Sequence, residues 1–427
     1  MGDTKKLISN SSIVFVGTII GSFFAYLFNM LMGRMLGPDL YGELISIFSL
    51  LAIIGVAGTA ILTISMRYSG ELYNQHQTRA LNRLYKFLTR NVVYLSILFF
   101  ILGLLLSGPI AKFLSLPQTW PVILAFLCMV FSLLTTINRG FLQGTQKFIT
   151  LSFLSVAEMG IRLLLGILLV YFGFKLFGAI SAVVVASISI YIISLFSIKK
   201  IIKINPAETG IGFKFNKKEI LNYAWPTLIS SLLLAVSINV DIIMVKHFFD
   251  PETAGLYAAI STIAKIILYI SAPIVSVMFP MISEKKVKGD RHYKLFLSSL
   301  LFTLLSGLVI LAFYNIMPGK IISLLYGSEF ASFYSYLPEA GLFVLFYALA
   351  NLIINYYLVI KDFTFLYFYG LVLILQIVSI FIWHGSITII IRDLIATNGL
   401  LFVLLIGYYL ITKRALIKQF LKGDYES

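Results

Sequence analysis

The sequence predicts an all-α polytopic membrane protein with about twelve transmembrane helices in two six-helix lobes. Its 427 residues have a mean hydropathy of +0.97, and only 12% of them are charged. A soluble globular chain carries about 25% charged residues, so this composition indicates a chain that lies mostly in lipid. Long apolar runs recur along the whole length, and a polar seam recurs at one offset in both halves.

The repeated seam indicates that one multi-helix unit is used twice. Pro38 lies in the seam that follows the first apolar run, and Pro251 lies in its counterpart, 251 − 38 = 213 residues later. Glu71 and Glu284 each close the next run, and they are also 284 − 71 = 213 residues apart. The offset is half of the chain. Internal repeats of this kind are typical of transporters whose substrate site lies between the repeats.

Twelve runs are long enough to span a bilayer, since a transmembrane helix needs about 20 mostly apolar residues. The first run follows Lys5 and Lys6, but it is too long for the apolar region of a secretory signal, and we expect it to be the first transmembrane helix. The runs are 11–33, 42–66, 91–108, 119–140, 150–173, 176–198, 220–246, 254–282, 295–316, 338–360, 364–384 and 394–412.

The basic residues predict the orientation. With a cytoplasmic amino terminus, 25 of the 33 Lys and Arg residues lie in cytoplasmic segments and six in outer ones, and two remain inside helices. An excess of positive charge on the cytoplasmic side is the usual orientation signal. We therefore expect a multi-pass protein of the cell membrane (plasma or inner membrane) with both termini in the cytoplasm. The six outer residues are Arg34, Lys112, Lys175, Lys246, Lys320 and Arg392.

The expected organisation is a six-helix lobe over 1–198, a basic cytoplasmic linker over 199–219, a second lobe over 220–412 and an amphipathic tail over 413–427. Each lobe begins and ends in the cytoplasm, so the repeats are parallel. The segments 79–90 and 413–422 both carry an apolar stripe opposite basic residues. We expect them to lie on anionic headgroups, with partner binding as the alternative.

Several functional classes are disfavoured. The single cysteine, Cys128, allows no internal disulfide, and the four histidines have no metal-ligand spacing. No phosphate loop, carboxylate dyad or nucleophile motif is visible, so we expect no enzyme activity, cofactor or metal. The net charge of +15 would suit nucleic acid. However, the positive charges alternate between loops, and we expect no nucleic-acid partner.

Four ionisable residues fall inside predicted spans, where a charge costs several kcal/mol and usually faces a cavity or a partner. Glu158 and Arg162 lie four residues apart on one helix face, and Arg162 is about 18 Å from the cytoplasmic end of its helix. Lys265 has a similar depth from the outer end of its helix, and Asp241 lies nearer the outer surface. One interpretation is two structural ion pairs, Glu158 with Arg162 and Asp241 with Lys265.

The other interpretation is a cationic cavity. Arg162 and Lys265, one from each lobe, would then attract an anionic headgroup such as a pyrophosphate. The carboxylates beside them would carry H⁺ or Na⁺ for coupling. Further polar groups occur in or at the ends of the spans, either as substrate contacts or as interhelical hydrogen bonds. These are Arg139, Asn29 and Asn239, which we keep as candidate contacts, and Asn138, Asn351, Asn355 and Gln376.

Four motifs together resemble the oligosaccharide-lipid flippases of polysaccharide biosynthesis, which belong to the multidrug/oligosaccharidyl-lipid/polysaccharide exporter superfamily. The similarity covers nearly the whole chain and depends on the order and spacing of the motifs. They are Gly33-Arg34-Met35-Leu36-Gly37-Pro38-Asp39-Leu40-Tyr41-Gly42, Arg139-Gly140-Phe141-Leu142-Gln143-Gly144, Asp241 followed by Pro251-Glu252-Thr253-Ala254-Gly255-Leu256-Tyr257, and Leu325-Tyr326-Gly327-Ser328-Glu329-Phe330.

The resemblance implies two lobes in a V around a central cavity that opens to either side in turn. It implies a substrate of polyprenyl-pyrophosphate-linked sugars, membrane lipids around the protein and glycan-assembly enzymes as possible partners. The first predicted helix has no mid-membrane arginine and only Arg34 at its outer end. This departure argues against the peptidoglycan precursor and for a capsule, O-antigen or similar glycan. A cation-coupled drug exporter of the same superfamily is the alternative, and a membrane-embedded glycan enzyme is disfavoured by short outer loops.

Overall fold

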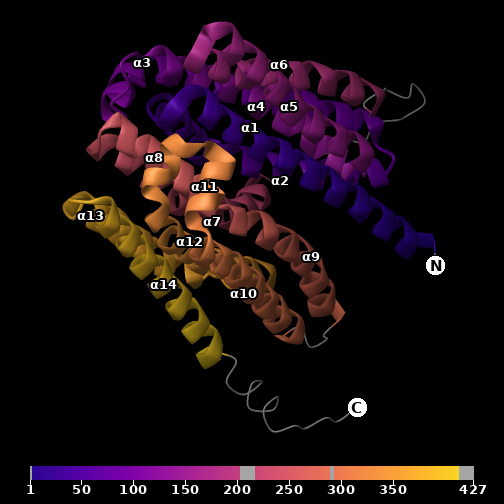
Figure 1. Cartoon of the computed structure of the whole chain (residues 1–427). Coiled ribbons are helices and arrows are strands. Elements are labelled where there is room, and N and C mark those ends of the chain that lie inside the picture. The colour runs from indigo at the N-terminus through magenta and orange to yellow at the C-terminus, as the bar shows by residue number, and fades with distance from the viewer. Residues whose placement is uncertain (1, 202–216, 289–292, 413–427) are drawn as a thin grey trace. The chain divides into compact units, whose positions relative to one another are not determined.

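A computed structural model describes residues 2–201, 217–288 and 293–412 (Figure 1). Helices make up nearly all of the described chain, and no strand occurs in it. The all-α prediction is therefore confirmed. Most of the predicted linker, residues 202–216, and the predicted amphipathic tail lie outside the described residues.

In the first half, the last three helices begin and end close to the predicted apolar runs, whereas the predicted run 42–66 is divided between two helices and the helix over the predicted run 91–108 begins already at Thr78. A short π-helix at Val170–Phe174 separates the last two. The helices are α1 (Gly2–Ile54), α2 (Ala57–Asn74), α3 (Thr78–Phe113), α4 (Trp120–Gly144), α5 (Phe148–Leu169) and α6 (Lys175–Ile201).

The second half has the same character, with one short helix and a 3₁₀ segment at Ser328–Tyr336 between its longer helices. The helices are α7 (Lys217–Phe248), α8 (Pro251–Ala264), α9 (Ile266–Lys288), α10 (Tyr293–Ile316), α11 (Pro318–Tyr326), α12 (Leu337–Ile360), α13 (Phe365–Ile382) and α14 (Ile387–Thr412).

The long helix α1 is in fact a hairpin of two helices. Gly37 has φ 73° and ψ 172°, outside the helical region, and Pro38 follows it. The rings of Phe28 and Phe48 lie 6.1 Å apart, whereas twenty residues of straight helix would separate them by about 30 Å. The chain therefore reverses at Gly37, where glycine tolerates the positive φ that other residues avoid.

Ten stretches of the described chain are long and apolar enough to cross a membrane. Two of them, Val16–Ile54 and Phe148–Lys199, have 39 and 52 residues and each contain an internal break. Each is long enough for two crossings of about 20 residues. This gives the twelve crossings that the sequence predicts.

The chain divides into two compact units. Unit 1 comprises Met1–Ala235, Ile242–Ala259 and Ser323–Phe330, and unit 2 comprises Val236–Asp241, Ile260–Ile322 and Ala331–Ser427. Unit 1 thus contains all of the first predicted lobe. It also includes α7 apart from Val236–Asp241, most of α8 and the end of α11, which the sequence analysis places in the second lobe.

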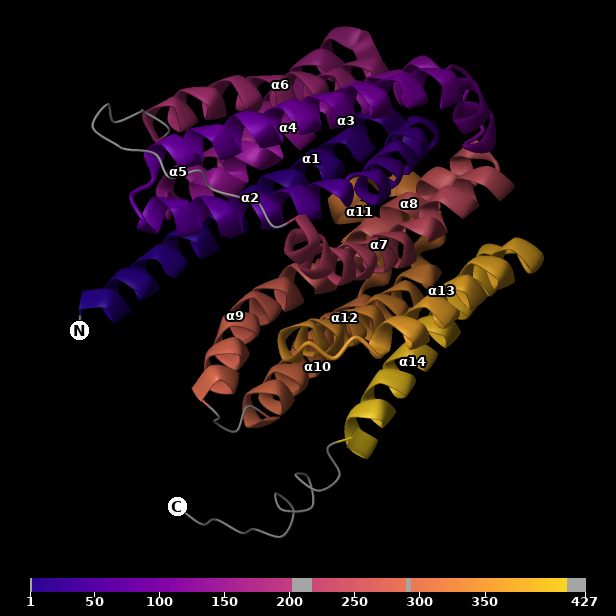
Figure 2. The ribbon, with the colours of Figure 1, turned by 180° about the vertical axis from the view of Figure 1, so that it is seen from behind.

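Unit 1 is built around close contact between α1 and α5, with α4 and α6 beside them (Figures 1 and 2). Small residues permit this approach. A Cβ atom on Gly17 would lie 2.6 Å from the Ser152 side chain, and one on Gly166 would lie 2.6 Å from the Phe28 ring. Such small residues are typical of helix interfaces in membranes, where packing rather than the hydrophobic effect holds helices together.

The amphipathic stripe of 79–90 packs inside unit 1. Leu81 and Leu84 have no exposed surface and belong to a core cluster with residues of α2 and α4, while Tyr85 and Leu88 pack against it. The expectation that this stripe lies on headgroups is wrong for its apolar residues. Its helix continues without a break into the transmembrane part of α3, and this continuity brings the stripe against the bundle.

Unit 2 is centred on α12, which contacts α9, α10 and α14. Three buried aromatic rings, Phe296, Tyr356 and Tyr409, pack with centroid distances of 4.3 to 5.6 Å. A hydrogen-bonded pair joins α7 to α13: Gln376 donates to the backbone oxygen of Ser237 at 3.0 Å and accepts from its hydroxyl at 3.2 Å. Gln376 is therefore an interhelical contact.

Three of the motifs quoted above meet in unit 1 (hereafter the seam cluster: Pro38, Tyr41, Gly42, Gly255 and Tyr326). A Cβ atom on Gly42 would lie 2.8 Å from the Gly255 nitrogen, and one on Gly255 would overlap the Pro38 carbonyl. The hydroxyls of Tyr41 and Tyr326 are 3.0 Å apart and buried. The seam residues therefore pack against one another.

Candidate functional site

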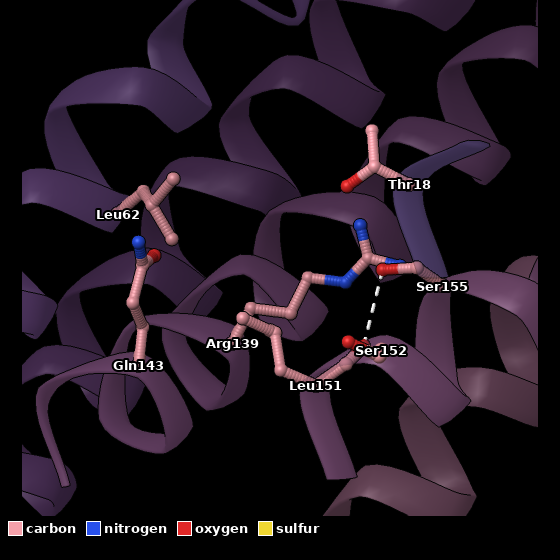
Figure 3. A pocket seen from close by; sticks show the side chains of 7 residues that line it. All are labelled: Thr18, Leu62, Arg139, Gln143, Leu151, Ser152 and Ser155. Carbon is pink, nitrogen blue, oxygen red and sulfur yellow. Dashed lines mark hydrogen bonds between the residues drawn. The ribbon is translucent and has the colours of Figure 1, made fainter. Parts of the chain in front are cut away.

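A polar pocket lies in unit 1 where α1, α2, α4 and α5 come together (Figure 3). Its volume is about 150 Å³. The Arg139 side chain extends across it towards Thr18 and Ser155 (Figure 3). Hydroxyl and amide groups thus surround one cation in an otherwise apolar bundle. The lining residues are Thr18, Leu62, Arg139, Gln143, Leu151, Ser152 and Ser155.

Arg139 forms an ion pair with Glu158, from its Nη2 to the Glu158 Oε2. Their side chains are 29% and 20% exposed, so both are largely withdrawn from the surface. The sequence interpretation pairs Glu158 with Arg162, one turn further along α5. In the structure Glu158 reaches across to α4, because the end of α4 brings Arg139 beside this face of α5.

Arg162 lies against two aromatic rings. Its Cζ atom is 4.2 Å from the centroid of Phe28 and 4.4 Å from that of Phe48. Both distances are within the range of cation–π attraction, which is about 6 Å. Arg162 is half-buried, and its charge is held within the apolar part of unit 1.

Unit 2 contains two of the candidate ionisable residues, Asp241 and Lys265. Asp241 is completely buried, and the Ser261 hydroxyl donates to its Oδ2 at 3.2 Å. Asp241 is also close enough for its charge to act on Lys265. Lys265 lies at the break between α8 and α9, so the break places its side chain where two helix ends meet. This arrangement favours the interpretation of Asp241 and Lys265 as partners.

Asn29 and Asn239, the remaining candidate contacts, are half-buried. Asn29 lies on α1 one residue after Phe28, and Asn239 lies on α7 two residues before Asp241. The seven candidates therefore form two groups, each within one compact unit. Unit 1 contains Asn29, Arg139, Glu158 and Arg162, and unit 2 contains Asn239, Asp241 and Lys265.

Asn138 belongs to a structural network. Its Oδ1 accepts a hydrogen bond from the Tyr85 hydroxyl at 2.9 Å, and its Nδ2 donates to the Ser194 hydroxyl at 2.6 Å. Asn138 is 1% exposed. It thus joins α3, α4 and α6, as expected for a polar residue that holds membrane helices together.

Two buried charges were missed by sequence reasoning. Lys246 is 1% exposed and Glu43 6% exposed, and their charges interact. Asp39 and Asp250 also act on Lys246. Lys246 is among the six residues expected in outer loops, but it lies in the last turns of α7. The apolar residues Val245 and Phe248 beside it were the available signal that the helix continues past the lysine.

The candidate groups can recognise a ligand through charge and hydrogen bonds. Arginine and lysine donors attract anions, hydroxyls and amides bind sugars or phosphates, and the carboxylates balance the cations. Among the residues that the structure describes, no group of three or more His, Cys, Asp or Glu residues comes together as a metal site.

In the part of the chain that the structure describes, long apolar helices that together allow twelve crossings, with charges held within them, define a polytopic membrane protein. The chain belongs to the polysaccharide biosynthesis protein family, whose model matches residues 7–286.

The fold is that of MOP-superfamily transporters. The chain is similar to an inward-facing multidrug resistance MATE transporter of that superfamily, with a TM-score of 0.75 and 13% identity, covering 96% of this chain and 99% of that one. It is similar to the lipid II flippase MurJ in an inward closed conformation, with a TM-score of 0.66 and 17% identity, covering 95% and 87%. The chain is also similar to a MOP-superfamily transporter from Pyrococcus furiosus that is described as having a binding pocket of reverse polarity. The TM-score is 0.64 and the identity 14%, over 95% of this chain and 96% of that one.

A sequence relative is the uncharacterized membrane protein MJ1375 of Methanocaldococcus jannaschii. It is 28% identical over 214 residues, which are 46% of this chain and 50% of that protein. The match therefore spans about half the length of this curated relative.

Proposed function

We propose that this protein is a flippase that moves polyprenyl-(pyro)phosphate-linked oligosaccharides from the cytoplasmic to the outer leaflet of the cell membrane. The product would serve the synthesis of a capsule, O-antigen or similar surface glycan. Family membership supports a role in polysaccharide biosynthesis. The fold supports alternating access, in which the substrate site opens to one side at a time.

The observation that carries the proposal is the charge of three residues on α4 and α5 in unit 1. Arg139 and Arg162 lie within or beside the apolar spans, and Glu158 balances one of them. Together Arg139, Arg162 and Glu158 carry a formal charge of +1, which suits a (pyro)phosphate and repels a cationic drug. Arginine binds phosphate oxygens through its forked donors, which makes it the fitting residue for this task.

The substrate is bound in two parts in this proposal. Arg162 binds the pyrophosphate, and the hydroxyls and amides of the polar pocket, together with Asn29, bind sugars. Lys265 and Asn239 are further candidate contacts for the same substrate. Glu158 and Asp241 balance the cations and carry the coupling H⁺ or Na⁺. The polyprenyl chain remains in lipid, and glycan-assembly enzymes supply and consume the substrate.

The test is surface glycan in cells that depend on this protein. Arg162→Ala and Lys265→Ala should each abolish glycan export while the amount of protein in the membrane stays the same. Lys320→Ala removes a cation from an exposed position and serves as the matched control. Normal export by either of the first two variants removes that residue from the site. Export of cationic dyes without export of glycan would favour a cation-coupled multidrug exporter, the alternative function.

A further inference from the structure

The guanidinium of Arg162 lies against two aromatic rings, an arrangement that partial burial of a charge does not by itself require. The guanidinium carbon lies 4.2 Å from the Phe28 centroid and 4.4 Å from the Phe48 centroid, and the two centroids are 6.1 Å apart. These three distances form a nearly right-angled triangle with the guanidinium at its corner. The rings therefore flank Arg162 on two sides and do not enclose it.

The two rings come from different arms of the α1 hairpin, one before Gly37 and one after it. Phe28 has no exposed surface, and its ring fits against Gly166 on the same helix as Arg162. Phe48 is half-buried. The corner is thus built from both arms of the hairpin and from α5, the helices in closest contact in unit 1.

An aromatic corner does two things for a cation at this depth. The negative faces of the rings offset part of the cost of removing the charge from water. They also restrict the guanidinium to a few orientations, and a restricted fork of donors loses less entropy when it binds an anion. An aliphatic pair of the same volume would provide the packing without these two effects.

We propose that Phe28 and Phe48 are positioning residues that orient the Arg162 guanidinium for the substrate phosphate. This inference rests on the proposed function, because it assigns the two rings to the phosphate end of that site. The rings do not touch the substrate in this proposal. They act through Arg162, and their removal weakens binding without changing the net charge of the site.

The experiment measures binding of polyprenyl pyrophosphate without sugar to the purified full-length protein in detergent. Phe28→Leu and Phe48→Leu should each weaken binding about three- to thirtyfold, the range that loss of one cation–π contact gives. Phe48→Tyr keeps the ring face and should bind as the wild type does. Phe23→Leu, which changes a ring that is 58% exposed, is the matched control and should also bind as the wild type does.

A second measurement separates positioning from packing. Fluorinated phenylalanines at position 48 keep the ring's shape and make its face progressively less negative. Affinity should fall with each added fluorine, while the melting temperature stays constant. The positioning role would be overturned if the fluorinated proteins and the Leu variants all bound polyprenyl pyrophosphate with the affinity of the wild type. Wild-type binding by Arg162→Ala would instead remove Arg162 from the phosphate site, and that result counts against the proposed function.

Discussion

Gly42 and Gly255 are in direct backbone contact, and they are also equivalent positions of the internal repeat, since 255 − 42 = 213. A Cβ atom on Gly42 would lie 2.8 Å from the nitrogen and 2.9 Å from the Cα of Gly255. Each glycine lies near the start of the helix that follows its seam. The two repeats therefore meet at the same residue of each copy, where the missing side chains let the backbones touch.

This contact predicts a strong effect of Gly255→Ala. The added methyl group would overlap the Pro38 carbonyl oxygen, and backbone atoms cannot move aside as a flexible side chain can. We expect a loss of about 1–3 kcal/mol in the free energy of unfolding, the usual effect of overpacking. Thermal unfolding of the purified protein measures it.

Gly407→Ala is the control for that substitution, because a Cβ atom there would meet nothing within 4 Å. Its melting temperature should equal or slightly exceed that of the wild type, since alanine is the better helix former. If Gly255→Ala has the same melting temperature as Gly407→Ala, the close backbone contact of Gly255 with Pro38 and Gly42 does not exist.

The ion pair of Arg139 and Glu158 predicts a large coupling energy. Arg139→Gln or Glu158→Gln alone should destabilise the protein by about 2 kcal/mol, because each leaves a withdrawn charge without its partner. The double variant should lose less than the sum of the two. A double-mutant cycle on thermal or denaturant unfolding measures the coupling. Additive losses would show that the two side chains do not interact.

The core position of Leu84 predicts a different result from a helix on the membrane surface. Leu84→Ala should cost about 2–5 kcal/mol in stability because it opens a cavity in a packed cluster. Leu105→Ala, on the same helix but 71% exposed, should cost little. Unfolding of the two variants in the same detergent checks this. Similar small losses at both positions would restore the headgroup interpretation of 79–90.

Most of the fold could be predicted because composition and repeat length depend only on the sequence. The twelve apolar runs and the reversals near Pro38 and Gly173 follow from hydropathy and from glycine and proline. The packing of 79–90 could not be predicted. An apolar stripe opposite basic residues suits a headgroup surface and a bundle equally, and only the position of neighbouring helices decides between them.

The candidate site was harder to predict for the same reason. Spacing on one helix pairs Glu158 with Arg162, but it contains no information about Arg139, which approaches from α4. The helix break at Lys265 could not be predicted, because no proline or glycine lies beside it in the sequence. The aromatic corner of Arg162 depends on the reversal of α1, which brings residues 28 and 48 together.

Asp250 predicts a pH dependence of stability at the start of α8. Its Oδ1 accepts a hydrogen bond from the Thr253 backbone N–H at 2.9 Å, and the hydrogen bonds to Thr253 hold the pKa of the Asp250 carboxyl below its usual value of 3.8. A carboxyl with a lowered pKa in the folded state stabilises the fold above its unfolded pKa and loses this effect as the pH falls.

The wild type should therefore be more stable than Asp250→Ala by roughly 1 kcal/mol at neutral pH, the usual value of a helix cap. This difference should be constant above about pH 5 and shrink below about pH 4. Chemical unfolding of both proteins across this range measures it. A difference that grows with falling pH would contradict the assigned hydrogen bond.

The measurement that most directly tests the central claim is flipping by the purified protein in liposomes. A fluorescent polyprenyl-pyrophosphate-linked oligosaccharide is placed in the membrane, and a reagent that cannot cross it reports the leaflet in which the sugar lies. We expect the wild type to exchange the sugar between leaflets, Lys320→Ala to match it, and Arg162→Ala and Lys265→Ala to be as slow as empty liposomes. Equal rates for wild-type protein and empty liposomes, or undiminished exchange by both variants, would contradict the account.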